Sequence, residues 1–449
     1  MVNGKTTVID GYDVVIAGAG PTGCVLAKEL VKKGKKVILL EAGDDSRAFI
    51  GTPLGLICGK HAITNLPKSM FITTEEGDQV IVGRGLGGGT KLYAGAAFMP
   101  DFNMWRSWKI DLEPYIDEAV KESWVSEIPD DFVGQGARRM MEASAKVGLP
   151  FKKMLRHVRW DRCIKGCNKA GVGCAQEAKW EGKYTLEDAI KMGARVMYNT
   201  TAQEVILENG KAVGFRAVQK GNPVEVRASA VISSCGGYSS VALAKKAGLD
   251  RAGSTFTGDP SCMTFGFLPK GQTGNGNEHQ FAAAYHDKPH GCIFGSVCGS
   301  SSLFSWIVMR AMKEGLGVIK DAGKYNQVMT VFSKVHDDDR GWVDADGKMS
   351  KTYSALDMER QAYSWDMNDK ILIASGCDPD NLIKMPVILG HPSGTVQIGK
   401  LLGHHCESLD IPNLYFCDAS CFPEALGMPP VLTLVALAMY EADYLASVI

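Results

Sequence analysis

Six residues near the start of the chain form a glycine-rich turn of the kind that binds phosphate. The turn reads Gly-Ala-Gly-Pro-Thr-Gly; it follows a short apolar run at residues 12–17 and precedes a helical pattern at residues 24–33. In such a turn the glycines allow a tight bend, close approach of a pyrophosphate and close helix–strand contact, and the first helix amides face the phosphates. We therefore predict that the phosphate-binding residues are Gly18, Gly20, Pro21, Thr22 and Gly23.

An acidic residue completes this unit. A second apolar run, residues 37–40, ends in Glu41, where a carboxylate is placed to bind the two hydroxyls of a ribose. A glycine-rich turn alone is weak evidence, but strand, turn, helix, strand and acid in register predict a dinucleotide-binding unit. The acid disfavours NADP and suits both FAD and NAD, so this segment leaves the choice between those two open.

A second glycine-rich loop bears on that choice. Residues 83–90 read Gly-Arg-Gly-Leu-Gly-Gly-Gly-Thr, a composition that gives backbone amides free access to a phosphate or a flavin. The loop resembles the second FAD-binding signature of the glucose–methanol–choline (GMC) oxidoreductases. The resemblance implies FAD as cofactor, with contacts from Arg84, Gly87, Gly88, Gly89 and Thr90. No histidine lies in residues 83–95, where some family members attach the flavin, so we expect FAD to be bound non-covalently.

Three further segments resemble the same family in the expected chain order. Residues 231–249 resemble its central strand–glycine–helix segment, residues 389–399 its catalytic histidine segment, and residues 414–438 its closing strand, flavin loop and last helix. A strand at residues 202–207 resembles the one whose backbone reads the adenine. The FAD contacts that these matches imply are Val205, Asp418, Ala419 and Pro430. For Asp418 the alternative is that it caps the loop that follows it.

His391 carries the chemistry that the resemblance implies. Oxidation of an alcohol by a flavin moves a hydride from carbon to flavin N5 and a proton from the hydroxyl to a base. A histidine suits that role because its pKa lies near working pH. His391, in Gly-His-Pro-Ser-Gly, matches the family's catalytic histidine. We therefore expect His391 to accept the hydroxyl proton, with an ionisation near neutrality.

Two positions depart from the family pattern. Pro429 occupies the place of a second catalytic histidine or asparagine and offers neither a donor nor a base. Tyr93 replaces a frequent asparagine, and its phenol would hydrogen-bond the substrate or pack beside the flavin. His404 and His405 follow His391 closely but are expected in an exposed turn. Lyase, isomerase or C=C reduction chemistry therefore stays open beside alcohol oxidation, as does an electron-transfer subunit whose flavin only relays charge.

A group of cysteines suggests a second redox or metal centre. Cys163, Cys167 and Cys174 lie in a short glycine-containing loop. Three thiolates so placed are able to hold a three-iron cluster, or a zinc with a fourth ligand, and in some relatives cysteines of this region hold an iron–sulfur cluster. The spacing is not the usual ferredoxin one, and structural thiols are the alternative. The cysteine content favours a dehydrogenase, which passes electrons to an acceptor other than oxygen, over an oxidase.

The implied fold is α/β, with a doubly wound, Rossmann-like FAD-binding domain of discontinuous segments and an α+β substrate domain that contains an antiparallel sheet. The predicted boundaries are residues 1–97, 180–252 and 386–449 for the FAD-binding domain, and residues 98–179 and 253–385 for the substrate domain. Extended runs at residues 328–336 and 341–348, the latter with an Asp-Ala-Asp-Gly turn between extended runs, predict two strands of the antiparallel sheet.

The composition is that of an ordinary globular protein. Among 449 residues, 45% are apolar and 22% are charged, and the formal net charge is −1. The absence of a block of like charges argues against nucleic acid as a partner. No apolar run is long enough to span a bilayer and no signal peptide is apparent, so we expect a cytoplasmic protein with no membrane span. The expected partners are an alcohol or polyol substrate and a redox partner or other electron acceptor.

Overall fold

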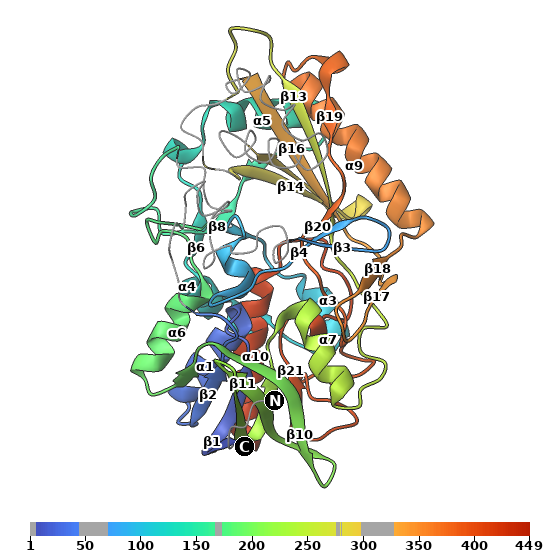
Figure 1. Cartoon of the computed structure of the whole chain (residues 1–449). Coiled ribbons are helices and arrows are strands. Elements are labelled where there is room, and N and C mark those ends of the chain that lie inside the picture. Colours follow the sequence, from blue (N-terminus) through green and yellow to red (C-terminus); the bar gives the residue numbers. More distant parts are fainter. Residues whose placement is uncertain (1–5, 45–70, 167–172, 275–278, 280, 298–326) are drawn as a thin grey trace.

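Two β-sheets, one above the other in Figure 1, organise the computed structural model of the chain. The structure describes residues 6–44, 71–166, 173–274, 279, 281–297 and 327–449. One sheet carries the glycine-rich turn, and the other carries most of the central part of the sequence.

The first sheet has the strand order β10-β11-β12-β1-β2-β9, with β21 also paired to β12. Its strands are β1 (Thr7–Ala17), β2 (Val37–Leu40), β9 (Arg195–Met197), β10 (Thr200–Glu208), β11 (Lys211–Gln219), β12 (Asn222–Ser233) and β21 (Leu414–Phe416). Five of them run parallel, whereas β10 and β11 are antiparallel. The end of β1 and all of β2 are buried, as expected for parallel strands that are covered on both faces.

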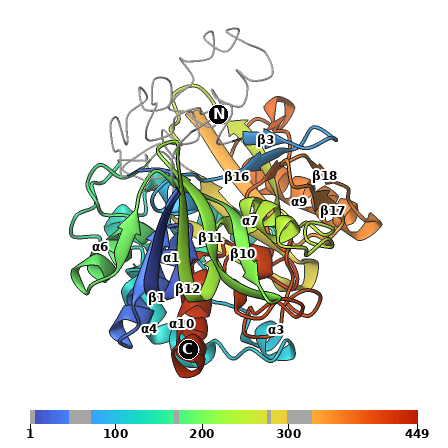
Figure 2. The ribbon, with the colours of Figure 1, turned by 60° about the horizontal axis from the view of Figure 1, so that its bottom comes forward.

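Four helices pack around this sheet: α1 (Pro21–Lys32), α6 (Gly182–Lys191), α7 (Gly236–Lys246) and α10 (Val431–Val448). α1 contacts both α6 and α10, and α7 lies beside β10 (Figure 2). Within the described part of the chain, only α10 is long and apolar enough to cross a membrane. Because 67% of it is buried inside the protein, α10 is better explained as the core helix of this layer.

The second sheet has the order β3-β4-β20-β13-β16-β15-β14-β7, with β19 beside β13. Its strands are β3 (Phe71–Thr73), β4 (Gln79–Ile81), β7 (Lys152–Lys153), β13 (Pro260–Phe267), β14 (Ala283–Asp287), β15 (Cys292–Val297), β16 (Val328–Val335), β19 (Ile383–Lys384) and β20 (Ile388–Leu389). The central pairs are antiparallel. α9 (Ala355–Ala374) and α5 (Gln135–Lys146) cover one face of it.

The two faces of β16 differ. Met329 and Val331 pack in the apolar cluster that includes α9, and Asn368 of α9 donates a hydrogen bond to Ser333. Since successive side chains of a strand point to opposite faces, the alternate residues of β16, Lys334 among them, point away from α9. One face of β16 therefore packs against α9, and the other face, which is also buried, carries Lys334.

Small elements connect the two sheets. They are α3 (Phe102–Ser107), α4 (Ile116–Glu122), a three-stranded sheet of β5 (Ala96–Ala97), β6 (Val125–Glu127) and β8 (Leu155–His157), and a hairpin of β17 (Gly341–Val343) and β18 (Met349–Lys351). Short 3-10 turns include η2 (Gly88–Lys91) and η9 (Ala419–Cys421).

The α/β class and the antiparallel sheet are confirmed, and so is the strand predicted at residues 328–336. The strand predicted at residues 341–348 is wrong: β17 covers its first three residues, a turn follows, and the hairpin pairs only with itself. β3, β4 and β20 join the second sheet although we assigned their segments to the FAD-binding domain. The domain boundaries themselves stay a prediction.

Candidate active site

The glycine-rich turn is shaped by close backbone contacts. Gly18 has a φ of 102°, and a Cβ placed on it would lie 2.4 Å from the carbonyl oxygen of Ser234 at the end of β12. A Cβ on Gly23 would lie 2.1 Å from the carbonyl oxygen of Gly18. Pro21 begins α1 and Thr22 is buried beside it. The turn therefore holds β1, α1 and β12 closer together than any larger residue would allow.

The second glycine loop lies against the first. A Cβ on Gly88 would come within 3.1 Å of the Cα of Gly20. Among the described residues, one on Gly20 would have no neighbour closer than 3.8 Å and one on Gly89 none within 4 Å. Thr90 fixes the loop, because its hydroxyl donates to the carbonyl of Gly87 and accepts from the amide of Gly182. The two loops thus meet and leave open space beside Gly20 and Gly89, which fits a bound pyrophosphate.

Glu41 braces the same turn. Its buried carboxylate accepts the amide of Ala19 at 2.9 Å and the amide of Gly43 at 2.7 Å. Each oxygen keeps a second lone pair for a ribose hydroxyl. The position of Glu41 at the end of β2 therefore fits the adenosine part of FAD, and the contact stays a prediction.

Asp418 has the capping role that was its alternative. Its carboxylate accepts the amide of Ser420 at 2.7 Å, the amide of Gly236 at 2.8 Å and the hydroxyl of Ser240 at 2.7 Å. Burial raises the pKa of this carboxyl. These bonds join η9, which begins at Ala419, to the start of α7. A contact of Asp418 with FAD stays a prediction.

Three other predicted FAD contacts lie at separate places. Pro430 caps the start of α10, Val205 is buried in the middle of β10, and Arg84 is exposed at the second glycine loop. β10 starts next to Glu41, because the amide of Thr200 donates to the Glu41 carbonyl. Their contacts with FAD also stay predictions.

His391 forms a hydrogen-bonded pair with Asp259. Its Nδ1 lies 2.9 Å from Asp259 Oδ2, and the side chains are 20% and 2% exposed. An ionised carboxylate accepts the Nδ1 proton, which leaves the Nε2 lone pair free. In the described part of the chain no group hydrogen-bonds to Nε2. The arrangement orients the imidazole ring and leaves Nε2 able to accept a proton.

The charge state of His391 differs from our expectation. Burial, together with the nearby Lys334 ammonium, lowers the pKa of His391 to about 4, although Asp259 acts in the opposite direction. The expected ionisation near neutrality is therefore wrong. His391 is neutral at pH 7, as a base must be.

The sequence did not point to Asp259. Several hydrogen bonds hold this residue in place. It has a φ of 50°, a conformation that asparagine and aspartate tolerate better than other residues. Its Oδ1 accepts the amide of Gly427 at 2.9 Å, and its own amide donates to Asp337 at 2.9 Å. Asp337 forms a fully buried ion pair with Lys351 at 2.7 Å. Gly427 lies two residues before Pro429, so the proline segment approaches the His391–Asp259 pair.

Tyr93 and the paired histidines lie elsewhere. The Tyr93 hydroxyl donates to the carbonyl of Trp180 at 2.7 Å, and burial raises its pKa. No contact in the described residues links it to His391, so its catalytic role stays a prediction. His404 is exposed as expected, but His405 is partly buried because it stacks on α10.

The cysteine prediction is tested only in part. Cys163 and Cys174 are partly buried, and Cys167 lies outside the described residues. Cys174 Sγ accepts the amide of Ala178 at 3.3 Å. Across the described residues, no group of three or more His, Cys, Asp or Glu side chains is placed to hold a metal ion. An iron–sulfur or zinc centre thus has no support here, and the convergence of the three sulfurs stays a prediction.

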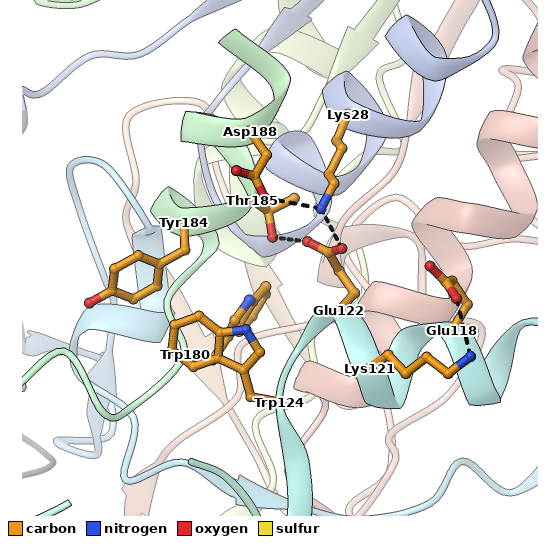
Figure 3. Close-up of a pocket in the computed structure, with 9 residues that line it drawn as sticks. All are labelled: Lys28, Glu118, Lys121, Glu122, Trp124, Trp180, Tyr184, Thr185 and Asp188. Carbon is orange, nitrogen blue, oxygen red and sulfur yellow. Dashed lines mark hydrogen bonds and ion pairs between the residues drawn. The ribbon is translucent and has the colours of Figure 1, made fainter. Parts of the chain in front are cut away.

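A pocket of about 190 Å³ opens between α1, α4 and α6 (Figure 3). Its lining consists of Lys28, Glu118, Lys121, Glu122, Trp124, Trp180, Tyr184, Thr185 and Asp188. Lys28 bonds to Glu122 at 2.6 Å and to Asp188 at 3.4 Å, so these charges satisfy one another. The pocket contains none of the predicted site residues, and we therefore place the active site at His391.

The α/β fold thus combines two glycine loops that meet beside open space with a histidine that a buried acid orients. Residues 12–260 and 337–438 match the amino-terminal and carboxy-terminal parts of the GMC oxidoreductase family. The chain therefore belongs to the GMC oxidoreductases, a family that depends on FAD.

Individual relatives are distant. An uncharacterized GMC-type oxidoreductase of Mycobacterium tuberculosis is 25% identical over 57% of this chain and 43% of its own length. A long-chain-alcohol oxidase of Arabidopsis thaliana is 23% identical over 95% of this chain and 66% of its own length. Among solved structures, pyridoxine 4-oxidase from Mesorbium loti matches with a TM-score of 0.69 at 15% identity, over 97% of this chain and 99% of its own. This last likeness shows the fold alone.

Proposed function

We propose that this chain oxidises an alcohol group of a small molecule, with His391 Nε2 as the acceptor of the hydroxyl proton. The two glycine loops would hold FAD, which would supply the acceptor for the hydride. The 2.9 Å bond between His391 Nδ1 and Asp259 carries the proposal, because it fixes the tautomer in which Nε2 is the base.

Asp259 has two tasks in this scheme. It holds the imidazole ring in one orientation, and its negative charge stabilises the imidazolium that forms as the proton arrives. The Gly427 amide shares the same carboxylate, which keeps Asp259 from turning away. No second base is needed at Pro429 if His391 is both oriented and neutral.

The names of the relatives support alcohol oxidation as the reaction class. Both the Arabidopsis long-chain-alcohol oxidase and pyridoxine 4-oxidase are named as oxidases. For this chain we keep an acceptor other than oxygen as the proposal, on its cysteine content alone. Comparing oxygen uptake with reduction of an artificial electron-accepting dye under one set of conditions tests that choice.

The test of the proposed reaction is anaerobic stopped-flow measurement of flavin reduction by a panel of alcohols, polyols and hydroxy acids. His391→Ala should bind FAD normally but reduce it roughly 10²–10⁴-fold more slowly, since general-base catalysis is worth that much. His404→Ala, at an exposed histidine, is the matched control and should react like the wild type.

Two outcomes would contradict the proposal. His391→Ala with the wild-type rate of flavin reduction would make the histidine structural. A substrate that is converted while the flavin stays oxidised would indicate lyase or isomerase chemistry.

A further inference from the structure

Lys334 is a buried lysine that the reaction scheme above does not use. It lies on β16, on the face that points away from α9, and only 8% of it is exposed. Its Nζ donates one hydrogen bond, to the Ser261 hydroxyl at 2.8 Å, across the β13–β16 pair. An ammonium has three donors, so two remain without a partner among the described residues.

The ammonium lies next to the catalytic histidine. A Cβ placed on Gly390 would be 2.6 Å from Lys334 Nζ, so the glycine before His391 makes room for the charge. The ammonium also acts on His391 directly, as one cause of its lowered pKa. Lys334, Gly390 and His391 therefore lie next to one another.

A second buried lysine shows how the fold satisfies such a charge elsewhere. Lys351 has an ion pair with Asp337 at 2.7 Å and bonds to the carbonyls of Phe256 and Asp338. For Lys334 no described carboxylate lies within ion-pair distance. Burial lowers its pKa to about 8, so the group still carries its charge at neutral pH. Asp259 and Asp337 favour that charge from beyond ion-pair distance, but the hydrogen bond of the ammonium goes to a neutral hydroxyl. A buried ammonium with donors to spare is suited to an anion that arrives with the substrate.

We propose that Lys334 binds the carboxylate of the substrate, and that the substrate is a hydroxy acid. This inference rests on the proposed function, since it names the class of alcohol. The C–H bond breaks with both electrons going to the flavin, the hydroxyl proton goes to His391, and a C=O bond forms. The carboxylate stays ionised and bound to Lys334 throughout, so the product is an oxo acid.

A binding measurement tests the anion site without turnover. Acetate, which cannot be oxidised here, is titrated into the FAD-loaded protein while the flavin absorbance is recorded. We expect a saturable change with the wild type, a loss of affinity of roughly 10-fold or more in Lys334→Met, and partial retention in Lys334→Arg, which keeps the charge. Lys384→Met is the control, because Lys384 is half exposed and paired with Asp369.

A specificity measurement tests the substrate class. Flavin reduction by glycolate and lactate is compared with reduction by ethylene glycol and propane-1,2-diol, their neutral counterparts. The wild type should prefer the acids, and in Lys334→Met the ratio of kcat/KM for acid over diol should fall by roughly 30- to 100-fold. FAD content of each variant, read from absorbance, shows that the variant is folded.

The outcomes separate this inference from the proposed function. If diols reduce the flavin while carboxylates neither bind nor react, or if Lys334→Met keeps the wild-type ratio, the hydroxy-acid inference is wrong and alcohol oxidation stands. If acetate binds in a Lys334-dependent way and no alcohol or hydroxy acid reduces the flavin, the anion site stands and alcohol oxidation is wrong.

Discussion

A histidine acts as a base only when it is neutral, and the surroundings of His391 keep it so well below pH 7. Two charged groups face it: Asp259 from the segment before β13 and Lys334 from β16, with the Asp337–Lys351 pair behind them. Desolvation and the ammonium lower its pKa to about 4, so the Asp259 charge is not the dominant effect.

We therefore expect the rate of flavin reduction by a neutral alcohol to be flat near pH 7 and to fall with acid only as the pH approaches the His391 pKa of about 4. Lys334→Met should move this acid limb to higher pH, because the ammonium no longer opposes protonation of the ring. Stopped-flow measurement of flavin reduction across a buffer series gives the acid limb of the wild type and that of Lys334→Met. A wild-type limb centred near 6.5, the ordinary histidine value, would show that the site does not perturb His391.

At this scale the sequence pointed to His391 but not to its partners. His391 sits in a local motif, Gly-His-Pro-Ser-Gly, that can be recognised by itself. Asp259 lies 132 residues away, and nothing around it marks it as different from other acids. Lys334 ends an apolar run whose pattern indicates only a buried strand. Both reach His391 through strand pairing, which no local spacing encodes.

At the level of elements, glycine has two roles in the β1–α1 turn: it allows close backbone packing at Gly23, and it leaves space for the pyrophosphate at Gly20. Gly23→Ala should lower the free energy of unfolding by roughly 1–3 kcal/mol, because its Cβ would overlap the Gly18 carbonyl at 2.1 Å and force α1 from β1. Gly20→Ala should fold normally, since its Cβ has no neighbour closer than 3.8 Å in the part of the chain that the structure describes. It should lose FAD, because that space is where we place the pyrophosphate.

Urea unfolding of the FAD-free proteins, and the flavin-to-protein absorbance ratio after purification, distinguish the two effects. A Gly20→Ala protein that retains its full content of FAD would show that the pyrophosphate does not bind at this turn. A Gly23→Ala protein as stable as the wild type would show that the backbone at Gly18 can shift at little cost in free energy.

The elements that were predicted correctly carry strong local signals. β1, α1 and β2 follow from an apolar run, a glycine turn and a helical period. The second strand predicted for the antiparallel sheet failed because Asp344 accepts the amides of Asp346 and Lys348, which closes a tight turn soon after Val343. A side chain that bonds its own backbone ended the strand early.

For the whole molecule, one buried acid links stability to pH. Glu441 on α10 is fully buried, and neither carboxylate oxygen has a hydrogen-bond partner among the described residues. Burial raises its pKa well above 4.5. An acid whose pKa is raised by folding is protonated in the native state and ionised in the unfolded state, so stability is lost as pH rises above the unfolded value.

Glu441→Gln should remove this dependence. Relative to the wild type, its unfolding free energy should increase as the pH rises above the unfolded value, by at most about 1.4 kcal/mol per pH unit, the amount for one proton. Urea unfolding at pH 5, 6 and 7 gives the difference. Glu118→Gln, at an exposed position on α4, should leave the slope unchanged. Parallel wild-type and Glu441→Gln curves would mean that Glu441 ionises in the native protein.

The carboxylate of Asp259 also governs when, during synthesis of the chain, the protein becomes able to react with substrate. Its two side-chain partners, His391 and Gly427, follow it by 132 and 168 residues. At ordinary rates of translation, a ribosome needs roughly 10–30 s to cover the longer distance. Within that time β16 is made first and β20 later, and until His391 is made the acid waits without the imidazole it will orient. The nascent chain can therefore shape its first glycine turn long before it can react, and substrate-dependent bleaching of the flavin reports the end of folding rather than any earlier stage.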